Sequence, residues 1–361
     1  MADYSVGGVS KERERLGKLV IWIATLVALI PLALQIAHEV GWTDRGLSNW
    51  RPVAYAFVLW SVMLCVGLVL SRGQKGEQAV FLLPATLLTI AFVIFPTIYA
   101  FFIAFSDWNL SAVSDRSFNG LGNFRKLFHD SGYWNAMRNM AYYVAAVLAQ
   151  YVIAFGLALL LNQDIRGRKF FRVVFLLPFM LSPVAVSFMI GKTIMNSQYG
   201  PYLLLLDALG IDRFPLFESA WSARLMIMIM DAWYSIPFML VLLLAGLQAM
   251  PREVIEAARV DGSSSWQTFR DMTFPLMLPV SVTAVILRVI FELKLLDVVK
   301  VVTGGGPGNY TDTVTLFIYR EGIERTNVGY ATALSTFYLF AIILLLTLLL
   351  WLVNKWMAKF A

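Results

Sequence analysis

Five ionisable residues lie in two otherwise almost entirely apolar segments: Asp231 in the first, and Arg288, Glu292, Lys294 and Asp297 in the second. A charged side chain in an apolar environment is costly, so it marks a functional site or an internal ion pair. On one continuous helix, Arg288 and Glu292 would share a face, and Lys294 and Asp297 a roughly opposite one, since each residue turns by about 100°. Each pair therefore allows two interpretations: a salt bridge within the helix, or a polar cavity for a ligand.

A second candidate for function is the polar stretch EAARVDGSSSWQTFRDMTFP (256–275), which separates two apolar segments. Pro251 suits the first turn of a helix, where its missing N–H costs nothing. Glu253 and Glu256 would then lie near the positive N-terminal end of that helix. Gly262 is expected to end it, because glycine adopts the left-handed conformation at low cost.

The remaining residues of this stretch favour a compact element with two helices. Neighbouring turns of the first helix carry Val254, Ala257, Ala258 and Asp261, and the alanines would let another surface approach closely. Ser264 and Gln267 fit a capping box, which predicts a second short helix, SWQTFRDM. An ordinary amphipathic linker is the alternative interpretation.

Several other chemistries find no support in the sequence. The single cysteine excludes an intrachain disulfide, and the two histidines lie far apart, which speaks against a His/Cys metal site. The string from Gly304 to Gly308 has the glycine density of a phosphate loop but not its pattern, so it predicts a tight turn. The chain therefore lacks a nucleotide-hydrolysing motif of its own.

The composition identifies the elements that must position these residues as membrane helices. Of the 361 residues 59% are hydrophobic and only 14% are charged, against about 25% charged residues in soluble domains. This excludes a large soluble helical enzyme, and we assign the net charge of +6 to Lys/Arg-rich loops rather than to nucleic-acid binding. Eight apolar segments are each near the ~20 residues that span a bilayer: 19–38, 52–70, 79–105, 140–162, 173–195, 223–249, 276–300 and 329–354.

The basic residues also predict an orientation. Lys and Arg are denser in the loops that lie on the same side of the membrane as the N-terminus. The short loop QDIRGRKFFR (163–172) is the strongest single indication that this side is the cytoplasm. Both termini and the stretch 256–275 are therefore expected in the cytoplasm. The first apolar run lacks a small-residue cleavage site, so we expect it to stay as an anchor.

The polar stretch resembles the EAA loop of ATP-binding-cassette importer permeases, in the form typical of the maltose-type sugar importers. The matching residues are Glu256-Ala257-Ala258, then Gly262, then the closing MTFP. The resemblance extends over nearly everything from residue 79 onward, through FLLPATLLTIAFVIFPTIYAFFIAFSDWN, GLGNFRKLF, RVVFLLPFMLSP, DAWYSIPFMLVLLLAGLQAMP and VTGGGPGNYTDTVTLFIYREGI. Extra spans before the core are typical of the first permease subunit of the maltose type.

The resemblance implies a fold and a coupling site. The fold class is an all-α polytopic membrane protein with eight transmembrane helices, N-in and C-in. A tail and two extra spans (1–78) would precede a six-helix permease domain (79–361) with a coupling loop at 251–275. The loop would dock on a separate ATPase through Glu253, Glu256, Ala257, Ala258, Asp261 and Gly262.

The resemblance also implies a substrate pathway near the middle of the membrane. The matching positions are Phe179 and Pro183, then Asp231, Tyr234, Ser235 and Phe238, then Arg288 and Glu292; Trp233 adds an aromatic surface. Arg288 and Glu292 are charged where the maltose subunit uses neutral polar groups. Arg288 would suit an acidic sugar derivative, unless Glu292 or Asp231 already neutralises it.

The implied protein is a non-catalytic permease subunit of a carbohydrate importer in the bacterial inner (plasma) membrane. It would pair with a second permease as a heterodimer, with two ATPase subunits that bind ATP and Mg²⁺, and with an external solute-binding protein. No cofactor or nucleic acid is expected on this chain itself. The alternative is an ion-coupled secondary transporter of a small polar solute, which would take up its substrate without an ATPase.

Overall fold

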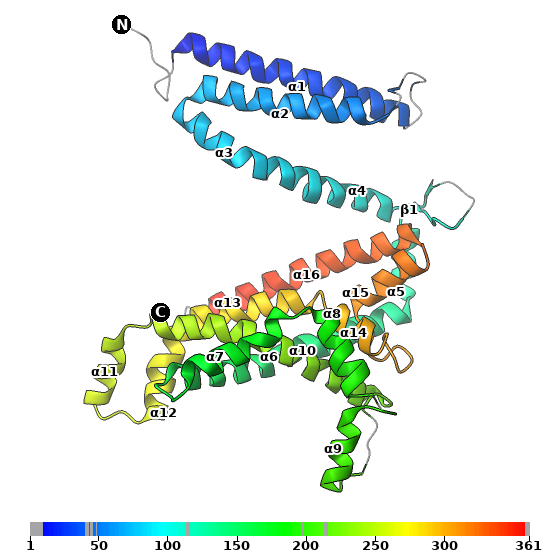
Figure 1. The fold of residues 1–361 in the computed structure, drawn as a ribbon. Coiled ribbons are helices and arrows are strands. Elements are labelled where there is room, and N and C mark those ends of the chain that lie inside the picture. Colours follow the sequence, from blue (N-terminus) through cyan, green and yellow to red (C-terminus); the bar gives the residue numbers. More distant parts are fainter. Residues whose placement is uncertain are drawn as a thin grey trace. The chain divides into compact units, whose positions relative to one another are not determined.

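The structure, a computed structural model, describes residues 10–39, 43, 46–47, 49–112, 116–196, 198–212 and 216–357. In these residues helices dominate (Figure 1), and the strands are confined to one two-stranded antiparallel pair. The chain divides into two compact units, Met1–Tyr99 and Ala100–Ala361. The sequence-based boundary at residue 78 stays a prediction.

The first unit is a helical hairpin followed by a third helix. Its elements are α1 (Lys11–Glu39), α2 (Arg51–Arg72), α3 (Gln74–Thr89), the π-helical turn η1 (Ile90–Ile94) and the start of α4 (Phe95–Ala104). Figure 1 shows α1 and α2 side by side. The two helices approach so closely at Gly17 that a Cβ on this residue would lie 2.7 Å from the carbonyl oxygen of Gly67. Small residues permit this kind of contact between membrane helices.

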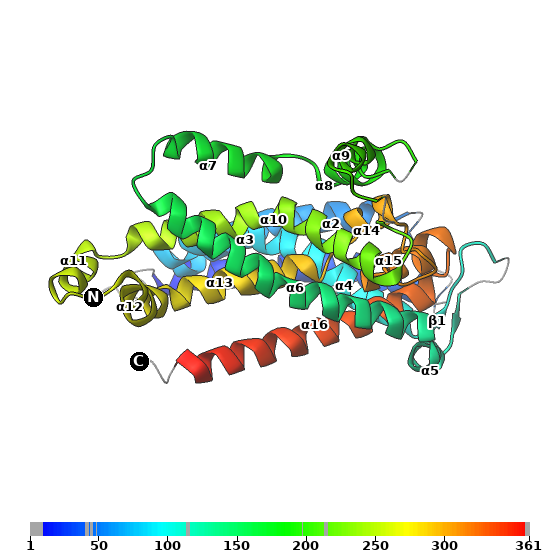
Figure 2. The same cartoon turned by 90° about the horizontal axis from the view of Figure 1, so that it is seen from below.

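The second unit contains the sequence features that predict function. Its strands are β1 (Ser106–Asp107) and β2 (Ser117–Phe118), and its helical elements are α5 (Gly122–His129), α6 (Ser131–Asn162), α7 (Arg168–Leu176), η2 (Leu177–Met180), α8 (Pro183–Ser187), η3 (Phe188–Ile194), α9 (Pro201–Leu209), α10 (Ala220–Ala249), α11 (Arg252–Val260), α12 (Ser265–Thr268), η4 (Phe269–Thr273), α13 (Phe274–Glu292), α14 (Asp297–Val302), α15 (Val314–Tyr319), η5 (Arg320–Glu324) and α16 (Val328–Met357). Figure 2 shows α6, α10 and α13 running along one another.

Within the described residues, seven helices are long and apolar enough to cross a membrane. An eighth span results if the bent pair Arg168–Met180 and Pro183–Ile194 is counted as one. The polytopic all-α fold is thus confirmed, while the number eight and the N-in, C-in orientation stay predictions. The bend of 94° follows from the prolines, because Ser182 before Pro183 is extended and cannot continue the helix.

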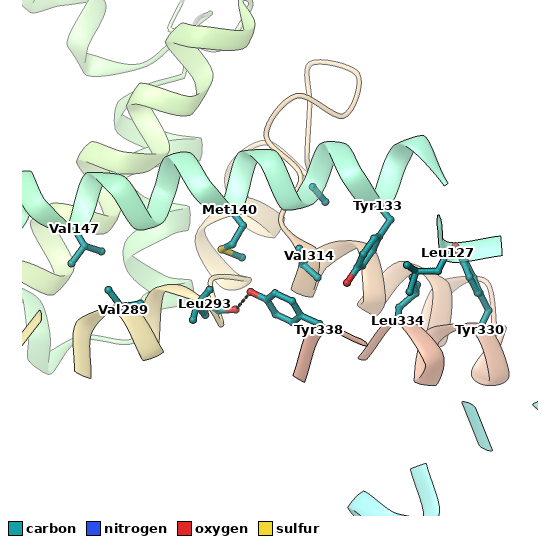
Figure 3. Packing of buried hydrophobic residues seen from close by; sticks show 11 residues of the cluster. Leu127, Tyr133, Met140, Val147, Val289, Leu293, Val314, Tyr330, Leu334 and Tyr338 are labelled. Carbon is teal, nitrogen blue, oxygen red and sulfur yellow. Dashed lines mark hydrogen bonds between the residues drawn. The ribbon is translucent and has the colours of Figure 1, made fainter. Parts of the chain in front are cut away.

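Buried apolar side chains of α6, α10, α13 and α16 form the core of the second unit. Figure 3 shows the cluster in which Tyr133 and Met140 of α6 face Leu334 and Tyr338 of α16. The Tyr338 hydroxyl donates to the carbonyl oxygen of Leu293 at 2.7 Å, so this core also holds the end of α13. These helices therefore give the candidate site a packed frame.

Candidate functional site

A cavity of about 310 Å³ lies among η2, α10, the end of α13 and the start of α14. Its aromatic wall consists of Phe179, Tyr234, Phe238 and Phe291, with the Phe179 ring centroid 5.8 Å from that of Tyr234 and 5.8 Å from that of Phe238. Its polar side chains are Asp231, Ser235, Arg288, Lys294 and Asp297. A volume of this size is at the lower end for small-ligand sites.

The structure brings most of the sequence-derived pathway residues to this cavity. Pro183 lines it, together with the residues from η2, α10 and α13. Glu292 does not line it but contacts Arg288, which does. Trp233 does not line it either, and 42% of this side chain is exposed, because it points to another face of α10 than Tyr234.

A buried ionic network forms the inner wall. Arg288 is only 2% exposed, and its Nη2 donates to carboxylate oxygens of both Asp231 and Glu292. Its Nε donates to Oε1 of Gln150 at 2.9 Å, and Gln150 Nε2 donates to Asp231 Oδ2 at 2.9 Å. The positive charge of Arg288 is therefore satisfied inside the protein.

Sequence reasoning missed Gln150. Its signal was a long polar side chain inside the apolar segment 140–162, which is costly in a membrane unless it finds a partner. In the structure α6 turns this amide toward both Arg288 and Asp231, so one residue links α6, α10 and α13.

The prediction that Lys294 and Asp297 share one helix face is wrong, because the helix does not continue through them. α13 ends at Glu292, and α14 begins at Asp297. The carbonyl groups at this break accept hydrogen bonds from side chains of other helices: Leu293 from Tyr338, and Leu295 from Thr315. Both charged side chains are exposed at the cavity, and no ion pair joins them among the described residues.

The predicted helix, glycine turn and second helix are all present. α11 ends before Gly262, whose φ of +73° is left-handed, and the Ser263 N–H donates to the Ala258 carbonyl at 3.0 Å. Ser264 and Gln267 form the expected reciprocal capping box. Figure 2 shows α11 and α12 beyond the ends of α10 and α13.

The side chains of this loop divide into two groups. Glu253, Glu256 and Asp261 are exposed, so the acidic groups are available to a partner. Ala258 is only 2% exposed and lies inside the elbow. The side chain of Ala257 lies outside the described residues, so the structure adds nothing about it.

The loop is continuous with the helix that carries the ionic network. From Ser265 to Glu292 the chain forms one helical segment of 28 residues, with the π-helical turn η4 inside it. Phe269 of η4 packs on Phe155 of α6 with ring centroids 5.7 Å apart. A displacement of α12 would therefore act along the helix that holds Arg288.

The glycine-rich string forms the predicted turns, and a partly buried ion pair holds them. Gly304, Gly305 and Gly308 all have positive φ angles. Arg320 Nη1 donates to Asp312 Oδ2 at 2.7 Å and a second nitrogen donates to the Gly304 carbonyl. Burial raises the pKa of the Asp312 carboxyl, and the nearby Arg320 charge partly opposes that rise.

A second arginine, which sequence reasoning also missed, holds this loop to the bundle. Arg224 of α10 is 5% exposed, and its Nε donates to the carbonyl oxygen of Tyr310 at 2.9 Å. Its guanidinium carbon lies 5.0 Å from the ring centroid of Trp221, within the range of cation–π attraction.

Within the described residues, no group of three or more His, Cys, Asp or Glu side chains forms a metal site.

Comparisons with known proteins agree with this architecture. Residues 132–359 match the family model described as binding-protein-dependent transport system inner membrane component. The chain is 32% identical over 273 residues to the probable ABC transporter permease protein y4oQ of Sinorhizobium fredii, covering 75% of this chain and 88% of that protein. It is 31% identical over 260 residues to the trehalose/maltose transport system permease protein MalF of Thermococcus litoralis, covering 72% and 88%.

A solved structure agrees at the level of the fold. A chain of the crystal structure of a bacterial alginate ABC transporter, in complex with its alginate pentasaccharide-bound periplasmic protein, superposes with a TM-score of 0.66. The sequence identity is 19%, and the match covers 84% of this chain and 96% of that one. The chain therefore belongs to the family of binding-protein-dependent transport system inner membrane components, as a multi-pass, non-catalytic permease subunit of an ATP-binding-cassette importer.

Proposed function

We propose that this permease carries a carbohydrate, and that the 310 Å³ cavity is part of its pathway. The cavity carries the proposal because it combines aromatic ring faces with exposed charged groups. Aromatic faces suit the C–H faces of a sugar ring, and charged side chains bind hydroxyl groups. Relatives named for trehalose, maltose and starch degradation products support this substrate class.

We favour a neutral glycoside over an acidic one. The guanidinium of Arg288 already contacts two carboxylates and the Gln150 amide, so it has little capacity left for an anionic substrate. The charges that a substrate would meet are Lys294 and Asp297, which have opposite signs and line the same cavity. Together they offer both donors and acceptors to hydroxyl groups without a net charge.

Permeases of this family work with a further permease, an ATPase and a solute-binding protein. For this chain we propose a heterodimer with a second permease and two ATPase subunits that bind ATP and Mg²⁺. The loop from Pro251 to Pro275 would dock on one ATPase in the cytoplasm, with both chain termini on that side. The exposed Glu256 would face a basic group of that ATPase.

Uptake by the reconstituted importer tests the proposal, with a neutral glycoside loaded on its binding protein. Tyr234→Leu removes part of the aromatic wall and should slow uptake about 2–10-fold, the rate factor that corresponds to the free energy of one aromatic contact. Trp233→Leu is the matched control, because it makes the same kind of change one residue away and outside the cavity. Equal loss in both variants would argue against the cavity.

The same preparation separates the importer from the ion-coupled alternative. Uptake should require ATP hydrolysis by the partner subunits and should persist when ionophores collapse every ion gradient. Uptake driven by an ion gradient, without a working ATPase, would contradict the proposal.

The two exposed charges of the cavity can be tested separately. Lys294→Met and Asp297→Asn should each weaken uptake of neutral glycosides. If Asp297→Asn gained uptake of anionic glycosides, Lys294 would be identified as the group facing the substrate.

A further inference from the structure

A second cavity, of about 230 Å³, lies where α7 faces α10, away from the cavity assigned to the substrate. Its walls are almost wholly hydrocarbon, with Leu161, Leu176, Leu240 and Leu244 among them. Two polar side chains also line it, Arg172 from α7 and Gln248 from α10. An arginine beside an apolar cavity calls for an anionic partner.

Arg172 has no such partner among the described residues. Its Nε and Nη2 are shielded from solvent and make no hydrogen bond there, although the side chain as a whole is partly exposed. A shielded guanidinium N–H without an acceptor is costly, and more so near hydrocarbon. By contrast, the neighbouring Arg168 donates from Nε to the carbonyl oxygen of Leu161 at 2.7 Å.

The cavity lies at the end of the bundle that carries the coupling loop. Leu161 is one residue before the end of α6, and Gln248 is one residue before the end of α10. Leu161 and Leu247 also belong to the same buried cluster as Met277 near the start of α13. Arg172 thus lies beside the ends of two apolar spans, where lipid headgroups are expected, with hydrocarbon-lined space next to it.

The chain around Arg172 is basic and presents apolar side chains outward. The segment 163–172 contains four basic residues and a single carboxylate, Asp164. On α7 and η2, the side chains of Phe171, Val173 and Leu177 are exposed. Basic side chains next to exposed apolar ones are typical of surfaces that contact an anionic leaflet.

We propose that this cavity binds an anionic phospholipid from the leaflet on the side of the coupling loop. The phosphate accepts hydrogen bonds from the guanidinium of Arg172 and from the amide of Gln248. The first carbons of an acyl chain fill the space beside Leu176 and Leu244. A protein carboxylate would satisfy the charge, but would leave the apolar volume unfilled.

Native mass spectrometry of the purified importer, after exchange into mixed phosphatidylcholine and phosphatidylglycerol, tests the proposal. The wild type should retain phosphatidylglycerol, and Arg172→Gln should retain it about tenfold less, the effect of one charge-assisted hydrogen bond. Arg125→Gln is the matched control, since Arg125 is exposed on α5 and does not line the cavity. Ala245→Phe fills the cavity while leaving Arg172 unchanged, and should also release the lipid.

Three results would overturn the proposal. Equal retention of phosphatidylglycerol by Arg172→Gln and Arg125→Gln would place the lipid elsewhere. Displacement of the bound lipid by millimolar glycerol 3-phosphate would indicate a site for soluble phosphates. Loss of a partner subunit from Arg172→Gln, with lipid retention unchanged, would identify a protein carboxylate as the true partner of Arg172. None of these results depends on which substrate the importer carries.

Discussion

Replacing Arg288 by methionine should destabilise the permease strongly, because it would leave two buried carboxylates without their cation. Asp231 is 5% exposed and Glu292 is 2% exposed, and both contact the guanidinium. Gln150 would also lose the donor to its Oε1. Removing one member of a buried ion pair costs about 3–5 kcal/mol, so we expect Arg288→Met to lower the free energy of unfolding by that amount.

Unfolding of the purified permease in increasing SDS measures this loss. Lys294→Met is the matched control: it also removes one cationic side chain, but an exposed one, and should change the free energy of unfolding by less than about 0.5 kcal/mol. Adding Asp231→Asn and Glu292→Gln to Arg288→Met should restore most of the loss, because no buried charge is then unpaired.

A different pattern would refute the structural role of Arg288. If Arg288→Met unfolded at the same SDS concentration as the wild type, the network would contribute nothing to stability. If that variant, in addition, lost uptake of acidic glycosides and kept uptake of neutral ones, Arg288 would be a substrate-binding residue. The preference for neutral glycosides would then have to be abandoned.

Three further changes test the loops. Gly262→Pro forces φ from +73° to about −65° and should abolish ATP-driven uptake, while an immunoblot of the membrane fraction shows normal insertion. Gly262→Asn is the control, because asparagine tolerates positive φ. Normal uptake by Gly262→Pro would contradict a fixed elbow. Gly305→Ala places a Cβ 2.1 Å from Asp312 Oδ1 and should cost about 1–3 kcal/mol, seen as a lower melting temperature; an unchanged one would refute the close approach. Ser264→Ala removes the capping box and should destabilise α12 by about 0.5–2 kcal/mol, seen as faster amide exchange at Gln267; unchanged exchange would argue against the cap.

The conformation of the loop 251–275 could be predicted almost completely, because its determinants are local. Gly262 adopts the left-handed conformation, which costs glycine little, and the Ser264 hydroxyl oxygen accepts a hydrogen bond from the N–H of Gln267, three positions away. The break after Glu292 could not be predicted in this way. Its carbonyl groups are satisfied by Thr315 and Tyr338, which lie 20 and 45 residues further along the chain.

The candidate site shows the same division between local and distant determinants. Tyr234 and Phe238 lie four residues apart on α10, so their shared face follows from helical periodicity. That Arg288 is satisfied internally depends on Gln150, which is 138 residues away. Packing between helices therefore decides which charges face a substrate. The sequence pattern alone left open whether Arg288 forms an internal ion pair or binds a ligand.

The ionic network and the loop proposed to dock on the ATPase belong to one mechanical unit. The segment Ser265–Glu292 is helical throughout, so α12 cannot shift along its axis without displacing Arg288 relative to Asp231 on α10 and Gln150 on α6. A buried charge pair resists such a displacement until new partners are available, because each separated charge is costly in a membrane. The network thus favours discrete arrangements of α13 over gradual sliding. A pathway that must be closed on one side before it opens on the other requires that behaviour.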